Sequence, residues 1–169
     1  MSTSASDTNS NNPPPALAGD ALALPAPALK PSPEALALGL AGLIPFAGGA
    51  LALWWLPEWG DLAAMALLTY AAVIVSFLGG IHWGLAMSQA RPPRGLLIWG
   101  VLPSLLAWAG MLLNSAWGLV LMAATLLICY VVDCQIYRPL RLGGWLLLRG
   151  VLTAVAVLSC LAGAAAFLV

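Results

Sequence analysis

Charge is scarce in this chain. Its 169 residues include six Lys and Arg and six Asp and Glu, and 62% of them are hydrophobic. Charged residues make up roughly 25% of an ordinary soluble domain, so this composition predicts an integral membrane protein. The net charge of zero leaves no basic surface for nucleic acid and no polybasic cluster for anionic lipid. The composition therefore excludes nucleic-acid binding.

Cysteine and histidine are also few. Cys129, Cys134 and Cys160 follow no metal-ligand spacing, and an odd number within or beside helices argues against a disulfide framework. We interpret them as small packing residues. His82 is the single histidine of the sequence. The sequence thus predicts no metal site and no cofactor.

Long uncharged, apolar runs fill the gaps between the charges. They cover 35–56, 62–89, 95–132 and 150–169. A helix needs roughly 20 residues, at about 1.5 Å each, to cross about 30 Å of hydrocarbon. The run 95–132 is too long for one crossing, and Asn114 with Ser115 marks a polar turn at its middle. The fold class predicted is all-α, with five transmembrane helices near 35–56, 62–89, 95–113, 116–132 and 146–168.

The first 33 residues differ from the rest in composition. They are rich in Ser, Asn, Pro and Ala, so residues 1–33 are predicted to form a disordered tail before a helical domain at 34–169. The tail has neither the basic region of a signal peptide nor the arginines of a mitochondrial presequence. We therefore expect a multi-pass protein of a bacterial inner membrane.

The orientation follows from the Lys and Arg residues, which remain on the cytoplasmic side in proteins with short loops. All six fall on one side of a five-helix arrangement: Lys30, Arg91, Arg94, Arg138, Arg141 and Arg149. The other connections contain no Lys or Arg. We predict a cytoplasmic N-terminus and a periplasmic C-terminus at Val169.

The segment 76–84, S-F-L-G-G-I-H-W-G, is the least ordinary stretch of the chain. Its small residues recur at the spacing that lets helix backbones approach closely in membranes. A second pair of small residues, Gly100 and Ser104, lies beside Pro103. The predicted helix-packing residues are therefore Ser76, Gly79, Gly80, Gly84, Gly100, Pro103 and Ser104. Gly80 and Gly84 lie across the helix from His82, which predicts neighbouring helices on both sides.

His82 and Asp133 are the second feature of interest, because an ionisable group inside a membrane is costly unless it is paired. Counting about 1.5 Å per residue places both near the cytoplasmic edge of the hydrocarbon. We expect them to be neighbours, with Arg91, Arg138 or Arg141 nearby. A structural clasp between helices is the favoured interpretation, and a working proton or ligand site is the alternative.

A catalytic triad of Ser104, His82 and Asp133 is not supported. Ser104 lies about ten residues after Arg94 and so roughly 15 Å deep, whereas the other two lie near the edge. The sequence contains no G-x-S-x-G elbow and no evident oxyanion donors. We therefore predict no catalytic residues and no enzyme activity.

Four motifs carry a resemblance to a known family: L-G-L-A-G-L-I-P-F at 38–46, S-F-L-G-G-I-H-W-G-L-A at 76–86, G-V-L-P-S-L-L-A-W at 100–108 and C-Y-V-V-D at 129–133. Over about 35–168 the chain resembles bacterial membrane proteins of a domain of unknown function that also includes eukaryotic transmembrane protein 69. The resemblance implies a small polytopic helical protein and no known activity. The positions to which it gives weight are His82, Gly79, Gly80, Trp83, Pro103 and Asp133.

The sequence therefore favours a non-enzymatic membrane component that binds lipid or a partner membrane protein, with a homo-oligomer as one form of partnership. A small transporter or proton-linked channel using His82 and Asp133 is the alternative. A third possibility, a membrane-embedded enzyme acting on lipid head groups, would need a richer polar cluster than His82, Asp133 and the loop arginines. A polar cavity that reaches both membrane faces would favour transport, one open only to the cytoplasmic interface would favour lipid or head-group chemistry, and a dry bundle would favour partner binding.

Overall fold

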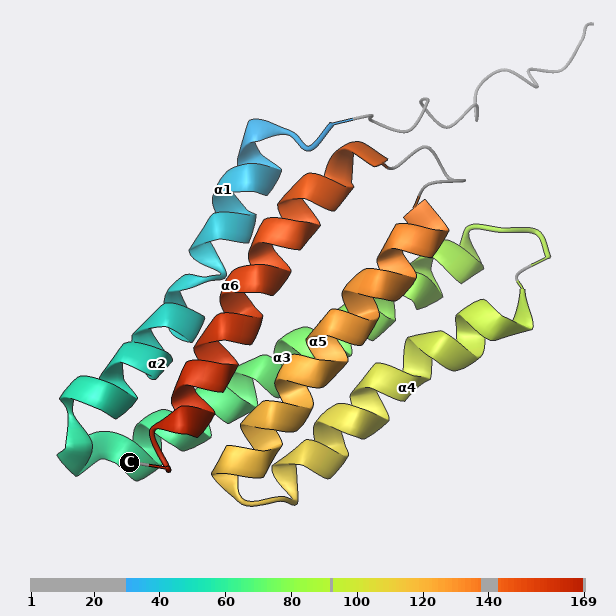
Figure 1. Ribbon diagram of the computed structural model, residues 1–169. Helices are drawn as coiled ribbons and strands as arrows, with labels where there is room; N and C mark the ends of the chain where they lie inside the picture. The colour runs from blue at the N-terminus through green and yellow to red at the C-terminus, as the bar shows by residue number, and fades with distance from the viewer. Residues whose placement is uncertain (1–29, 92, 138–142, 169) are drawn as a thin grey trace, which may run out of the picture.

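The computed structural model describes residues 30–91, 93–137 and 143–168. This part of the chain is helical and contains no strand. Its α-helices are α1 (Pro33–Ala41), α2 (Ile44–Trp55), α3 (Gly60–Met87), α4 (Arg94–Met111), α5 (Ser115–Tyr137) and α6 (Leu146–Ala165), as Figure 1 shows. Two short 3₁₀ turns, η2 (Pro57–Trp59) and η3 (Gly143–Trp145), precede α3 and α6.

Five helical segments are long and apolar enough to cross a membrane, which confirms the predicted number. The first crossing, Pro33–Trp55, consists of α1 and α2 together. The continuous helix expected over 35–56 is interrupted because Pro45 has no N–H to bond the carbonyl four residues earlier. The Tyr70 hydroxyl donates a 2.9 Å hydrogen bond to the carbonyl of Gly42 in this break. A side chain from α3 thus satisfies a carbonyl that the interrupted helix leaves free.

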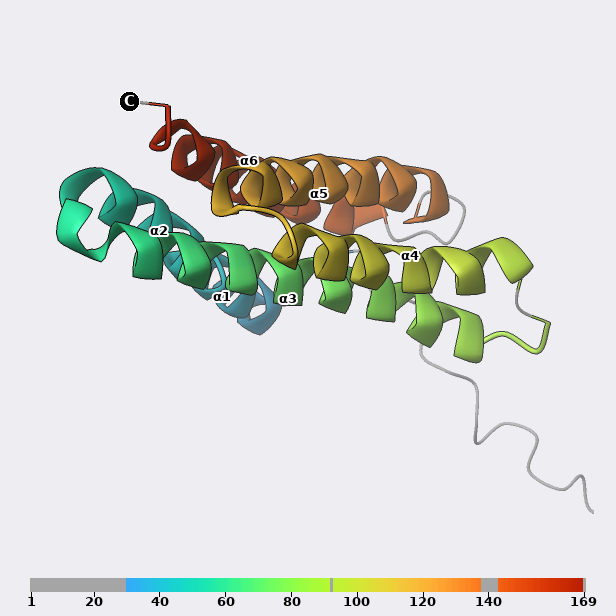
Figure 2. The same cartoon turned by 90° about the horizontal axis from the view of Figure 1, so that it is seen from below.

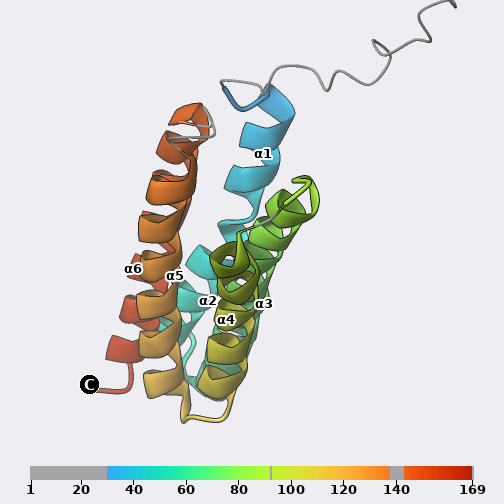
Figure 3. The same ribbon diagram turned by 90° about the vertical axis from the view of Figure 1, so that its right-hand side faces the viewer.

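Helix α3 is central in the bundle and packs against α2, α4, α5 and α6. Figures 1 and 2 show α5 beside α6 and α4 beside α3. The largest fully buried apolar side chains lie where these helices meet: Phe46, Leu67, Leu119, Met122 and Leu126. In Figure 3, α1 lies apart from α4, with α6 at its side. Helix α1 packs against α6.

One end of the bundle contains the start of α1, the end of α3 and the start of α4 and α6. We call it the basic end because Lys30, Arg91, Arg94 and Arg149 belong to it. The end of α6 lies at the opposite end (Figure 1). The first and last described residues therefore lie at opposite ends of the bundle, as an odd number of crossings requires.

Three of the predicted packing residues, Gly79, Gly100 and Pro103, form the close contact between α3 and α4. A Cβ on Gly79 would collide with the carbonyl oxygen of Gly100 and lie 3.5 Å from Pro103 Cβ. By contrast, apart from their chain neighbours and the nearby backbone of α3, no atom of the described residues lies within 4 Å of a Cβ built on Gly80 or Gly84. This corrects the expectation that Gly80 and Gly84 face another helix of this chain. Ser76 and Ser104 are half-buried.

Helix α5 continues to Tyr137, five residues beyond the end predicted at 132. The prediction ended this helix at Asp133 because a carboxylate is costly in hydrocarbon. In the structure Asp133 lies inside the helix and is 1% exposed. Its charge is paired with Arg149 of α6, and His82 of α3 lies beside it, so the helix can continue past this residue.

Candidate functional site: a buried ionic cluster beside an apolar groove

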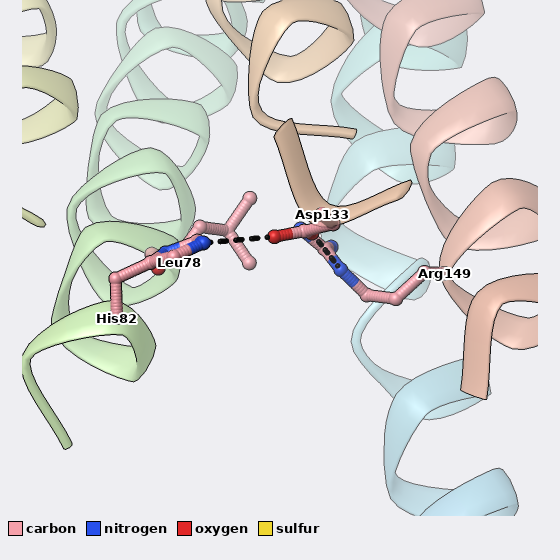
Figure 4. A network of polar contacts seen from close by, with 4 residues as sticks. All are labelled: Leu78, His82, Asp133 and Arg149. Carbon is pink, nitrogen blue, oxygen red and sulfur yellow. Dashed lines mark hydrogen bonds and ion pairs between the residues drawn. The ribbon is translucent and has the colours of Figure 1, made fainter. Parts of the chain in front are cut away.

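A cluster of three ionisable side chains joins three helices near the basic end. His82 comes from α3, Asp133 from α5 and Arg149 from the first turn of α6 (Figure 4). His82 and Asp133 are each 1% exposed, and the Arg149 side chain is 13% exposed. Such groups are stable in an apolar interior only when paired. The cluster therefore constrains how α3, α5 and α6 fit together.

Arg149 and Asp133 form the strongest contact of the cluster. Nε of Arg149 donates to Oδ2 of Asp133 at 2.8 Å, and Nη2 donates to the same oxygen. Both bonds are charge-assisted and therefore stronger than bonds between neutral groups. Because Oδ2 accepts both, the other carboxylate oxygen, Oδ1, is free to face α3.

The His82 ring lies between two oxygen atoms. Nδ1 is 3.0 Å from the carbonyl oxygen of Leu78, one turn earlier in α3. Nε2 is 3.2 Å from Asp133 Oδ1 (Figure 4). The distance is that of an ion pair, but Nε2 is not aligned for a hydrogen bond and has no hydrogen-bond partner among the described residues. We therefore treat it as a close polar contact rather than a hydrogen bond.

Further polar groups surround the cluster. Tyr137 of α5 is buried and interacts electrostatically with Asp133 and Arg149. The Trp99 ring of α4 lies edge-on to His82, with 6.5 Å between the ring centroids. Trp99 Nε1 and Thr153 Oγ1 are buried and make no hydrogen bond to any described residue. Buried polar atoms are rarely unpaired, so this concentration of them is unusual for the interior of a helical bundle.

The structure brings His82 and Asp133 together, as the sequence suggested, but the arginine beside them is not one of those expected. Arg91 is exposed after the end of α3, and Arg138 and Arg141 lie outside the described residues. Sequence reasoning missed Arg149. It was nevertheless distinguishable, because it is the single basic residue within the expected helix 146–168.

An apolar cavity of about 530 Å³ lies next to the cluster, between α1, α3, α5 and α6. We call it the groove. Its lining is almost wholly hydrophobic, except for Tyr137, Arg149 and Thr153. Two of its lining side chains are largely exposed, Leu38 of α1 at 75% and Phe77 of α3 at 64%. The groove therefore opens to the side of the bundle, between α1 and α3.

The groove has a defined extent along the helices. On three segments, the first and last lining residues are eleven positions apart: Ala35 to Phe46, Ile74 to Leu85 and Trp145 to Ala156. At about 1.5 Å per residue this separation is roughly 16 Å, about half of a hydrocarbon core about 30 Å thick. The groove thus extends from the basic end across a length equal to one leaflet. Arg149 and Tyr137 lie toward its basic end.

Metal binding has no evident site in the described ranges. No three His, Cys, Asp or Glu side chains come together there as ligands for a metal ion. The three cysteines form no disulfide with one another, and Cys129 and Cys160 are buried.

Comparison with known proteins places the chain in a family. The model of a family described as "Protein of unknown function (DUF3429)" matches residues 31–165. The chain belongs to this family. It is 39% identical over 145 residues to a protein of Xenopus tropicalis named "Transmembrane protein 69", covering 78% of this chain and 54% of the relative. A Mus musculus protein of the same name is 34% identical over 84 residues, covering 48% of this chain and 34% of the relative.

The matched part of this DUF3429 protein includes all five crossings and the ionic cluster. The chain spans about half the length of the frog relative and about a third of the mouse relative. No solved structure matches the chain. The family therefore identifies a membrane protein of unknown activity, and the function has to be argued from the site.

Proposed function

We propose that this protein is a non-enzymatic membrane component that binds one chain of a lipid-like molecule in the groove. The groove itself carries this proposal: a largely apolar cavity of about 530 Å³ that opens sideways and extends over one leaflet length. Ligand cavities are typically about 300–1,000 Å³, mostly apolar, with a few polar groups that orient the ligand. Tyr137, Arg149 and Thr153 are such groups here.

The occupant we propose is a single hydrocarbon chain with a polar head. A protein that crosses the membrane five times is surrounded by such chains, and the side opening between Leu38 and Phe77 gives them direct access. The head would lie at the basic end, beside Arg149 and Tyr137. The tail would lie along Ile74, toward Phe46 and Ala156.

Leu148 and Leu147 provide a matched test of the groove. Leu148 lines it, whereas Leu147 is 79% exposed and does not. The full-length protein, purified in mild detergent and analysed by native mass spectrometry, should retain about one lipid-like molecule per chain. Leu148→Trp fills the groove with an indole ring and should abolish this retention. Leu147→Trp makes the same change outside the groove and should leave it intact.

Both tryptophan variants should unfold at temperatures close to that of the wild type, because neither position belongs to the tightly packed core. Equal retention by the wild type and Leu148→Trp would reject the groove as the binding site. Absence of any retained lipid in the wild type would reject the proposed function itself.

We further propose that the protein lies in a bacterial inner membrane with its basic end in the cytoplasm. The support is the position of Lys30, Arg91, Arg94 and Arg149 at one end of the bundle. An alkaline phosphatase fused after Val169 should be active, since that enzyme requires the periplasm, and a fluorescent protein fused before Met1 should remain cytoplasmic. Two termini on the same side would contradict both the orientation and the five-helix count.

A further inference from the structure

Arg149 faces two environments. Two of its N–H groups point to Asp133 Oδ2, from Nε and Nη2. A guanidinium carries five N–H donors, and the same side chain also lines the groove. Arg149 therefore retains donors for a second acceptor, and the groove is where such an acceptor can reach it.

Both ring nitrogens of His82 face oxygen atoms. The Leu78 carbonyl can only accept, so in a neutral ring Nδ1, 3.0 Å from it, is the nitrogen that carries the hydrogen. Nε2 then presents a lone pair to Asp133 Oδ1, 3.2 Å away, and an ionised carboxylate also only accepts. One added proton would turn this contact into a donor and an acceptor.

The net charge of His82, Asp133 and Arg149 determines when His82 binds that proton. With neutral His82, the ionised Asp133 and Arg149 cancel. An anionic group on Arg149 would leave one negative charge in excess, which is costly in an apolar interior. A proton on Nε2 restores neutrality and gives Asp133 Oδ1 a donor while Arg149 also serves the anion.

We propose that the groove binds a single-chain amphiphile with an anionic oxygen headgroup on Arg149, and that binding is accompanied by uptake of one proton from water by His82. This inference rests on the proposed function. An N–H bond forms at Nε2, an O–H bond of hydronium breaks and releases water, and no electron is transferred. Arg149 binds the anionic headgroup. The proton on His82 offsets the negative charge of that headgroup, and Asp133, which lies between the two side chains, links them.

The titratable groups around His82 come from two helices. Asp133, Cys129 and Tyr137 belong to α5, and Arg149 belongs to α6. Cys129, Tyr137 and Arg149 interact electrostatically with the Asp133 carboxylate. Helix α4 contributes Trp99, which does not ionise. We assign His82 as the proton acceptor because its Nε2 is the nitrogen that faces the Asp133 carboxylate.

Calorimetry on the full-length protein in phosphatidylcholine nanodiscs tests this proposal. Lysophosphatidylglycerol has one chain and a phosphodiester monoanion that does not titrate near neutral pH, and lysophosphatidylcholine carries a neutral zwitterion on the same chain. Titration near pH 7 in two buffers of different ionisation enthalpy gives the protons taken up. We expect about one proton per lysophosphatidylglycerol and none with lysophosphatidylcholine.

The pH dependence has a defined sign. Because the proton is bound with the ligand, lysophosphatidylglycerol should bind more tightly at low pH. The affinity should fall by up to about tenfold for each pH unit. This slope applies over the pH range in which His82 and Asp133 carry no added proton in the free protein and one added proton in the complex. Lysophosphatidylcholine should show no such slope.

Two variants separate the cluster from other proton acceptors. His82→Gln offers Asp133 an amide donor that does not titrate, so it should bind lysophosphatidylglycerol more weakly and without proton uptake. Asp133→Asn removes the negative charge permanently, so it should bind without proton uptake and with little pH dependence. Glu34→Gln changes an exposed acid near the groove entrance and should retain the wild-type proton uptake.

Each result has one meaning. Binding of lysophosphatidylglycerol by the wild type without proton uptake would overturn this inference and leave the proposed function standing. Unchanged uptake in His82→Gln would overturn the assignment of the proton to the cluster. If neither lysolipid binds, the proposed function fails as well. If inorganic sulfate alone causes the same uptake, the anion needs no chain, and the lipid headgroup is rejected as its source.

Discussion

Asp133→Ala should destabilise the folded protein by about 3–5 kcal/mol, the cost of leaving a buried charge without its partner. Asp133 is the shared member of the cluster: Arg149 donates to one of its oxygens and His82 lies beside the other. Its removal leaves an arginine side chain that is 13% exposed with no counter-charge from α5. Equilibrium unfolding in mixed micelles with increasing sodium dodecyl sulfate measures the effect.

The other members of the cluster should cost less. His82→Ala leaves the Asp133–Arg149 pair in place, so its effect should be smaller than that of Asp133→Ala. The double variant His82→Ala, Asp133→Ala should cost less than the sum of the two, because each single change already removes the same contact between His82 and Asp133. Strict additivity, or a larger loss from His82→Ala than from Asp133→Ala, would reject this account of the cluster.

Gly79→Val should be the second severe change, with a loss near the upper end of the roughly 1–3 kcal/mol typical of overpacking. A Cβ at this position would collide with the carbonyl oxygen of Gly100. That oxygen belongs to a helix backbone, which cannot rotate away as a side chain can. Valine would therefore push α3 and α4 apart along their shared interface.

Gly80→Val is the matched control for this prediction. It makes the same change one residue later in α3, where no described atom beyond the chain neighbours and the nearby backbone of α3 lies within 4 Å of the new Cβ. The intrinsic helix cost of valine is the same at both positions, so the difference in unfolding free energy reports the contact with α4. Equal losses for the two variants would show that Gly79 makes no special contact.

Features that depend on local sequence could be predicted without the structure. The number of crossings and their approximate limits follow from the lengths of uncharged runs between residues such as Asp61 and Arg91. The pairing of His82 with Asp133 was accessible because both lie at the same calculated depth in helices that must lie near each other. These inferences need only the rise of a helix and the thickness of the hydrocarbon.

The choice of helix faces was decided by tertiary structure. Gly79 and not Gly80 meets α4, Arg149 rather than a loop arginine meets Asp133, and α1 diverges to open the groove. In a soluble protein, the buried face of a helix is marked by its hydrophobic residues. In a membrane, the lipid-facing and helix-facing sides are equally apolar. The sequence therefore determined where each helix crosses, while the rotation of each helix, and with it the site, depended on how the five crossings pack together.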